Sequence, residues 1–96
     1  MNTETGRAST AHASRYLQQL AKHWAHKNDV TFDKTTADIA LRGNRVSLRA
    51  ADGWLIATLT IGPDGDSDRL RQVFEEHINR FAFREAPLPF EWTSND

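Results

Sequence analysis

The chain has 96 residues, 39% of them hydrophobic and 26% charged, with a formal net charge of −1 and no cysteine. This composition is typical of one folded domain, and it excludes a disordered chain, disulfide bonds and thiolate chemistry. The near-neutral charge argues against nucleic-acid binding through bulk electrostatics. Because the sequence has no long apolar run and no signal-like N-terminus, we expect a cytoplasmic protein that does not enter membranes.

A first helix is expected after a short strand. Residues 6–10 are expected to form this short edge strand, Thr10 is the expected N-cap, and the helix runs to about Lys27. Apolar residues recur every three or four positions and define its core face: Ala13, Tyr16, Leu17, Leu20 and Trp24. No acidic residue lies between Glu4 and Asp29, so this helix is basic and would attract an anionic partner. The alternative is that its last basic residues only complement the negative end of the helix dipole.

A meander of three strands is expected next, after a short strand at residues 30–33. The dipeptides Gly43-Asn44 and Asp52-Gly53 predict two-residue hairpin turns that divide residues 37–61 into these strands. With Arg42 opposite Arg45 and Ala51 opposite Trp54, two apolar rows share one face: Ile39, Leu48 and Ala57, then Leu41, Val46 and Leu59. The mixed outer face is a solvated sheet, a dimer interface or a binding surface. It lacks an aromatic platform, which ranks nucleic-acid binding behind the other interpretations.

A second helix is expected at residues 68–84, capped by Asp66 or Ser67. Its apolar stripe includes a histidine: Leu70, Val73, Phe74, His77, Ile78 and Phe81. Prolines 87 and 89 prevent further helix, and residues 88–92 form a final edge strand. The expected fold is α+β and two-layered, with two helices packed on one face of an antiparallel sheet. Residues 1–96 form a single domain, with an ordered part of about 6–93.

Three histidines suggest a metal site. His23 and His26 stand one helical turn apart, and His77 on the second helix is the obvious third ligand. The alternative is that the first two are a flanking pair at a helix end, and that His77 is a hydrogen-bonded structural residue. No nucleophile motif, paired carboxylates, or nucleotide or flavin motif is present, so the sequence identifies no cofactor and an enzyme is the minority interpretation.

Basic residues on the two helices suggest an anion site. Arg80 and Arg84 are four positions apart, and Arg15 and Lys22 would join them if the helices lie side by side, so that a carboxylate or phosphate is bound. The alternative is ordinary solvated surface charge. The complete candidate ligand-binding set is Arg15, Tyr16, Lys22, His23, His26, His77, Arg80 and Arg84.

A family resemblance covers nearly the whole chain. It rests on Ser14-Arg15-Tyr16-Leu17, Leu20, Lys22-His23-Trp24, His26-Lys27, His77, Arg80-Phe81-Ala82-Phe83-Arg84-Glu85 and Trp92. These residues resemble bacterial domain-of-unknown-function family 2218, which has no assigned activity. Some members lie beside or are fused to siderophore-interacting flavoproteins, which implies a role near ferric-siderophore handling and such a flavoprotein as a partner. Members often carry a cysteine at the position of Ala21, so a thiolate role cannot operate here.

The sequence therefore predicts a small binding module for an anionic or metal-bearing small molecule, in an iron-related setting. The competing prediction is a protein-interaction or homodimerisation module whose histidines are structural. The first prediction requires the imidazoles and guanidiniums of the two helices to converge on one cavity. Sequence spacing does not supply that distance.

Overall fold

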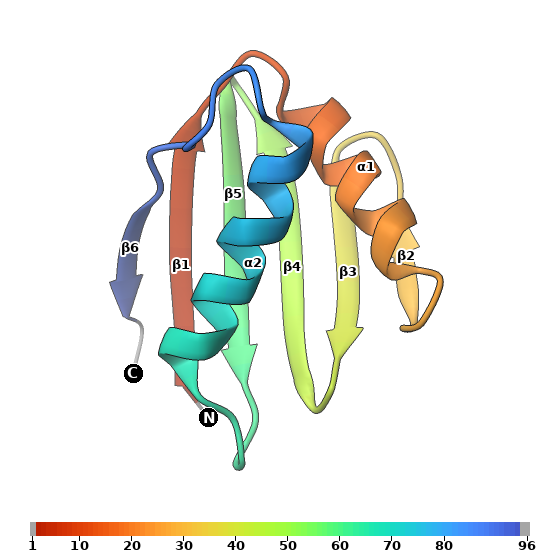
Figure 1. Cartoon of the computed structure of the whole chain (residues 1–96), viewed down its shortest axis with the longest axis vertical. Helices are drawn as coiled ribbons and strands as arrows, with labels where there is room; N and C mark the ends of the chain where they lie inside the picture. Colours follow the sequence, from red (N-terminus) through yellow and green to blue (C-terminus); the bar gives the residue numbers. More distant parts are fainter. Residues whose placement is uncertain (1, 95–96) are drawn as a thin grey trace.

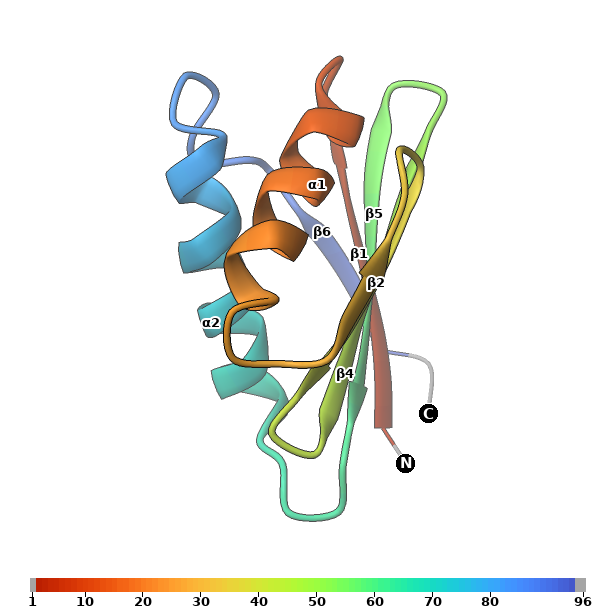
Figure 2. The ribbon, with the colours of Figure 1, turned by 90° about the vertical axis from the view of Figure 1, so that its right-hand side faces the viewer.

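Both helices lie on one face of a six-stranded antiparallel sheet in the computed structural model, which describes residues 2–94 (Figures 1 and 2). The elements are β1 (Asn2–Ser9), α1 (Ala13–Trp24), β2 (Val30–Phe32), β3 (Thr36–Leu41), β4 (Asn44–Ala51), β5 (Trp54–Ile61), α2 (Ser67–Phe81) and β6 (Glu91–Ser94). The strand order is β2-β3-β4-β5-β1-β6. The predicted α+β architecture with two helices on one face is confirmed. Neither helix in the described part is long and apolar enough to cross a membrane.

The first strand differs most from its prediction. β1 begins at Asn2 rather than near residue 6, and it lies between β5 and β6 instead of at an edge. It pairs with β5 along its whole length, from Asn2 opposite Ile61 to Ser9 opposite Trp54. Its apolar signal is weak because Glu4 and Gly6 occupy buried positions on the inner face. The pairing with β5 and β6, rather than local hydrophobic pattern, places this strand inside the sheet.

Both helices end earlier in the chain than predicted, and α1 also begins later. Thr10 is not the cap of α1; its hydroxyl accepts a hydrogen bond from the backbone N–H of His12, 3.1 Å away, and the helix begins at Ala13. Asp66 caps α2 as predicted, and its carboxylate accepts from the backbone N–H groups of the first turn. α1 ends at Trp24 and α2 at Phe81, each three residues before the predicted end.

The first hairpin turn lies one residue earlier than predicted. Its central residues are Arg42 and Gly43, with φ of 52° and 83°, so that Leu41 pairs with Asn44. The register of β3 on β4 is shifted by two positions, which places Ile39 opposite Val46 rather than Leu48. Because side chains alternate with a period of two, this shift leaves every residue on its predicted face. The second hairpin, with Ala51 opposite Trp54, is confirmed.

The core lies between the helix layer and the inner face of the sheet. Its largest fully buried side chains come from both layers: Phe74, Leu17, Leu20, Ile39, Leu55, Leu59, Ile78 and Val46. Burying each such side chain stabilises the fold by about 1.5–3 kcal/mol relative to leaving it exposed. The edge strand β6 starts at Glu91, three residues later than predicted, and its Trp92 ring covers Gly6. A Cβ atom at Gly6 would lie 2.6 Å from that ring, so this position requires glycine.

Candidate functional site

The two helices pack side by side and run in opposite directions, which creates two different ends (Figure 1). At one end, the start of α1 meets the segment after α2. At the other end, the last turn of α1 meets the middle of α2. We call these the closed end, defined by Thr10, Tyr16 and Glu85, and the open end, defined by His23, Trp24 and His77.

The open end brings two of the predicted histidines together. The ring centroids of His23 and His77 lie 5.7 Å apart. Trp24 packs against His77 at 5.1 Å, and Phe81 packs edge-on against His23 at 5.8 Å. Aromatic neighbours on both sides therefore restrict the two imidazoles. The predicted convergence of these side chains from two helices is present in the structure.

The His77 ring is oriented by its own helix. Its Nδ1 atom lies 2.7 Å from the backbone carbonyl oxygen of Val73. A carbonyl oxygen can only accept a hydrogen bond, so Nδ1 carries the proton in the neutral ring and Nε2 carries the lone pair. The half-buried His77 thus presents an acceptor or ligand atom, rather than a donor, on its second ring nitrogen.

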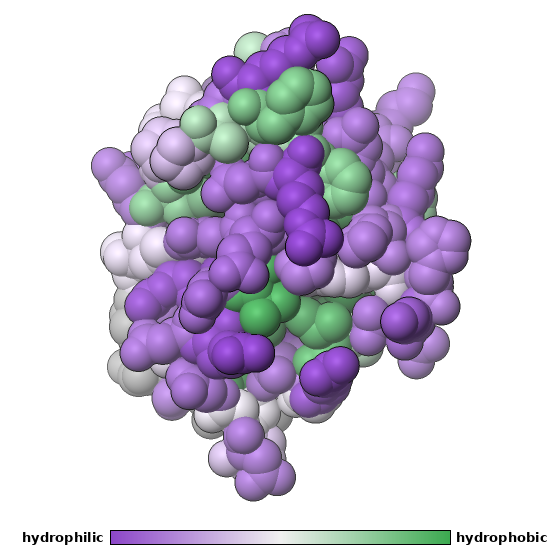
Figure 3. Space-filling model, viewed as in Figure 1, coloured by the Kyte–Doolittle hydropathy of each residue, from purple (hydrophilic) through white to green (hydrophobic). Residues whose placement is uncertain are grey.

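A cleft of about 820 Å³ opens beside these rings. Its apolar floor consists of Trp24, Leu41, Leu70 and Val73, and its rim carries Lys27, Arg42 and Arg69. Figure 3 shows a hydrophobic patch near the middle of the helix face, surrounded by hydrophilic side chains. Two carboxylates also line the cleft, but that of Asp66 is engaged at the N-terminus of α2. The cleft thus combines apolar contact area with a net excess of positive charge.

Three local structures shape this cleft. α1 stops at Trp24, whose carbonyl accepts from both the backbone and the side-chain N–H of Asn28 at 3.0 Å. Asn44, the first residue of β4, accepts a hydrogen bond from the backbone N–H of Gly62 at 2.9 Å, which ties the β3–β4 hairpin to the β5–α2 loop. A Cβ atom at Gly65 would lie 2.5 Å from the same Asn44 oxygen, so glycine is needed there. The turns therefore hold the rim residues in place.

The closed end holds Tyr16, which was predicted to bind a ligand. Its hydroxyl instead donates to the Glu85 carboxylate, which also accepts from the Thr10 hydroxyl at 2.9 Å. Burial, followed by the hydrogen bond to Glu85, raises the pKa of Tyr16. The Tyr16 hydroxyl lowers the pKa of Glu85, against the opposing effect of desolvation, and the Thr10 hydroxyl lowers it further. This network connects β1, α1 and the segment after α2, so Tyr16 has a structural partner.

The predicted basic cluster does not form in the cleft. Arg15, Lys22, Arg80 and Arg84 are exposed and none of them lines it; the Arg84 guanidinium lies over the Phe83 ring at 5.7 Å. The rim cations Lys27, Arg42 and Arg69 were missed as site residues. They come from a helix end, a hairpin turn and a new helix start, so no sequence spacing connects them. In the sequence, only the run of basic residues near Lys27 pointed to one of these three cations.

The predicted three-histidine metal set is not assembled. His26 lines the cleft together with His23 and His77. Within residues 2–94, however, no three His, Asp or Glu side chains are grouped so that they could hold a metal ion. The reason is that His26 follows the end of α1 at Trp24, so the helical spacing that would stack it on His23 does not continue.

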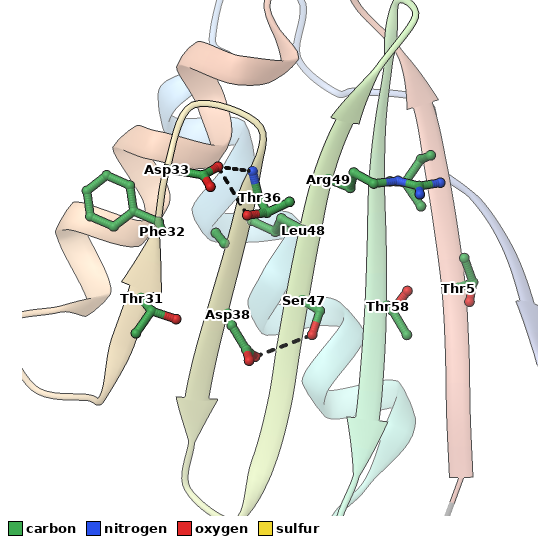
Figure 4. A pocket seen from close by; sticks show the side chains of 12 residues that line it. Thr5, Thr31, Phe32, Asp33, Thr36, Asp38, Ser47, Leu48, Arg49 and Thr58 are labelled. Atoms are coloured by element: carbon green, nitrogen blue, oxygen red, sulfur yellow. Dashed lines mark hydrogen bonds between the residues drawn. The ribbon is translucent and has the colours of Figure 1, made fainter.

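The outer face of the sheet has a second hollow, of about 770 Å³ (Figure 4). Polar side chains dominate it: Thr5, Thr31, Asp33, Thr36, Asp38, Ser47, Arg49 and Thr58. The backbone N–H groups of Thr35 and Thr36 hydrogen-bond to the Asp33 carboxylate at 2.8 Å and lower its pKa. Near the β4–β5 hairpin, the Arg7 guanidinium lies 4.8 Å from the centre of the Trp54 ring. This face is uncovered by helices but has no apolar floor comparable to that of the cleft.

Comparisons with known proteins give a family and a fold. The chain matches the model of an uncharacterised protein conserved in bacteria, domain-of-unknown-function family 2218, over residues 5–93. It is also similar to the NMR structure of PA4090 from Pseudomonas aeruginosa, with 28% identity and a TM-score of 0.76, covering 97% of this chain and 96% of that one. No curated protein matches. The predicted family and the two-layer fold are confirmed. Neither the family description nor the name of the similar structure states an activity.

Proposed function

We propose that this chain, which belongs to bacterial domain-of-unknown-function family 2218, is a small binding module that takes an anionic small molecule in the cleft at the open end. The observation that carries the proposal is the combination of Lys27, Arg42 and Arg69 around an apolar floor. The volume of about 820 Å³ falls within the roughly 300–1,000 Å³ usual for small-molecule pockets. A ferric chelate would be one member of this class of ligands. It would agree with the role near ferric-siderophore handling that the family resemblance implies.

The chemistry of the rim favours a carboxylate or phosphate with an apolar part. Guanidinium and ammonium groups form charge-assisted hydrogen bonds with such anions, and these are stronger than neutral ones. The Trp24 and Leu70 side chains would cover the apolar part of the ligand. Because the acidic side chains of the cleft are fewer than its basic ones, an anion is preferred over a cation.

The test is an amide NMR titration of the full chain with phenyl phosphate and benzoate, using benzyl alcohol as a neutral control. We expect saturable shifts around Lys27, Arg42 and Arg69, and much weaker binding of the alcohol. Arg42→Ala and Arg69→Ala should each weaken phenyl phosphate binding about tenfold. The matched control, Arg49→Ala on the outer face, should bind normally. Shifts scattered over both faces, or equal binding of the alcohol, would contradict the proposal.

A second candidate function is homodimerisation through the outer face of the sheet. Neither helix covers this face (Figure 2), and it carries the half-buried Trp54 and Ile56 among polar side chains. A two-fold arrangement of two copies would bury these two side chains against the partner copy. Light scattering tests it: a dimer that Trp54→Ala dissociates supports it, whereas a monomer at all concentrations refutes it.

A further inference from the structure

We infer that the anion bound at the open end is a metal chelate, whose metal ion is coordinated by His23 and His77 while the basic rim binds the chelator's carboxylates. This inference rests on the proposed function, because it uses the same cleft and narrows the class of ligand. It differs from the predicted three-histidine site, since the protein supplies two ligands and the chelator supplies the others.

The spacing of the two rings is suited to a shared ion. Two imidazoles bound to one ion at about 2.0–2.1 Å place their ring centroids roughly 4.5–5.5 Å apart, depending on the coordination angle. The centroids of His23 and His77 lie 5.7 Å apart, so a small rotation of the exposed His23 ring brings them into range. The two rings come from separate helices that already pack together in the fold.

The orientation of His77 is the one that metal-bound histidines adopt. Such residues usually donate their other ring N–H to a carbonyl or carboxylate, which fixes the tautomer and makes the ligating nitrogen more basic. The Nδ1 atom of His77 makes this contact with the Val73 carbonyl at 2.7 Å. The Trp24 ring packs against the same imidazole and holds its plane. His77 is therefore prepared to use Nε2 as a ligand atom.

The surroundings favour a chelate over a bare ion. No third His, Asp or Glu in residues 2–94 joins the pair, so two imidazoles alone would leave most coordination positions to other donors. The cleft is lined by three Lys or Arg and two Asp side chains, so its excess positive charge disfavours a free divalent cation. A chelator with several carboxylates removes both problems, since it fills the empty positions and pairs with the basic rim. Imidazole ligands point to copper, nickel, zinc or iron rather than calcium or magnesium.

The test uses Cu(II)–nitrilotriacetate, a singly negative chelate with open coordination positions, and the full wild-type chain. Calorimetry should give saturable one-to-one binding, and the electron paramagnetic resonance spectrum of the complex should show coupling to two imidazole nitrogens. Losing an outer-shell partner of a metal-bound histidine costs about 10- to 100-fold in affinity. His23→Ala and His77→Ala should therefore each weaken binding by at least that much.

Two histidine variants are matched controls. His12 lies beside Tyr16 at the closed end, so His12→Ala should bind the chelate normally. His26→Ala removes a cleft residue outside the pair and should keep both imidazole couplings. Thermal unfolding without ligand verifies that each variant is folded, and the exposed His23 gives a variant that keeps the core intact. Unchanged binding by His23→Ala, or coupling to a single imidazole, would overturn the inference.

The proposed function and this inference fail in different ways. If phenyl phosphate binds at the rim but Cu(II)–nitrilotriacetate does not, the metal pair is refuted and the anion cleft stands. If the chelate binds through the two imidazoles while Arg42→Ala has no effect and phenyl phosphate does not bind, the pair stands and the general anion cleft is refuted. If neither probe binds, both are refuted.

Discussion

Both ends of the helix pair carry polar side chains, which are mostly buried and paired at the closed end and mostly exposed at the open end. At the closed end, Tyr16 and Thr10 are both buried, and both donate to the Glu85 carboxylate. At the open end, His23 is exposed, His77 is half-buried, and basic side chains lie at the rim of the cleft. The closed end uses its polar groups to hold the helices and β1 together. At the open end, we propose that the polar groups bind an external anion.

This difference separates polar residues that support the fold from polar residues that reach solvent. Within the described chain, no buried side-chain nitrogen or oxygen lacks a hydrogen-bond partner, so burial and pairing go together at the closed end. The cleft residues reach solvent instead, where an unpaired polar group costs little. Mutations at the two ends should therefore change stability and binding in different proportions.

The largest effect on stability is expected from Trp24→Ala. This residue is an exception to the comparison, because it lies at the open end and still supports the fold. Trp24 is only 6% exposed, so it belongs to the core although it also forms the floor of the cleft. Replacing a buried tryptophan by alanine removes apolar contact and leaves a cavity, which costs about 3–5 kcal/mol of unfolding free energy. Urea denaturation followed by circular dichroism measures it. A loss below about 1 kcal/mol would show that Trp24 is not part of the core.

The next largest effect is expected from the closed end. Tyr16→Phe removes the hydroxyl that donates to Glu85, and a hydrogen bond to a charged group contributes about 1.5–3 kcal/mol. Glu85→Gln removes the charge from the same network. A double-mutant cycle should give a coupling energy of about 0.5–3 kcal/mol between the two positions. Additive effects would mean that the hydroxyl and the carboxylate act independently.

The same network predicts a loss of stability at both extremes of pH. The pKa of Glu85 is lowered in the folded protein, so its contribution is present above the ordinary value of 4.5 and is lost as pH falls through the folded value. The pKa of Tyr16 is raised, so the folded state keeps its proton and this contribution is lost as pH rises above the ordinary value of 10.0. Thermal unfolding across pH measures both. Tyr16→Phe should reduce the pH dependence on both sides, and an unchanged profile would contradict this account.

The sequence predicted the core faces of the helices better than the first strand and the first hairpin of the sheet. The apolar stripes of α1 and α2 are local and periodic, so their core faces could be recognised directly. β1 could not be recognised in full, because Glu4 is buried through a hydrogen bond with Arg71, which lies 67 positions away. The first hairpin was misplaced by one residue because Arg42, a side chain that seldom adopts positive φ, occupies a central turn position with φ of 52°.

The site was predictable where it depends on helix packing and not where it depends on turns. The meeting of His23 and His77 follows once two amphipathic helices share one face of a sheet. The contribution of Arg42 depends on the exact position of a hairpin, and that of Arg69 on the path of the β5–α2 loop. Tyr16 appeared on both the core stripe and the candidate site, and only its distant partner Glu85 shows which role it has.

The smallest effect on stability is expected from His23→Ala at the open end. The His23 side chain is exposed and its ring contacts the rings of His77 and Phe81, so its removal should change the unfolding free energy by no more than about 0.5 kcal/mol. If this residue instead served the fold as Tyr16 does, its loss would be comparable to that of Tyr16→Phe. Measuring both variants in the same denaturant series compares the two ends directly. Equal losses would contradict the distinction between a closed end that holds the helices together and an open end that contributes little to stability.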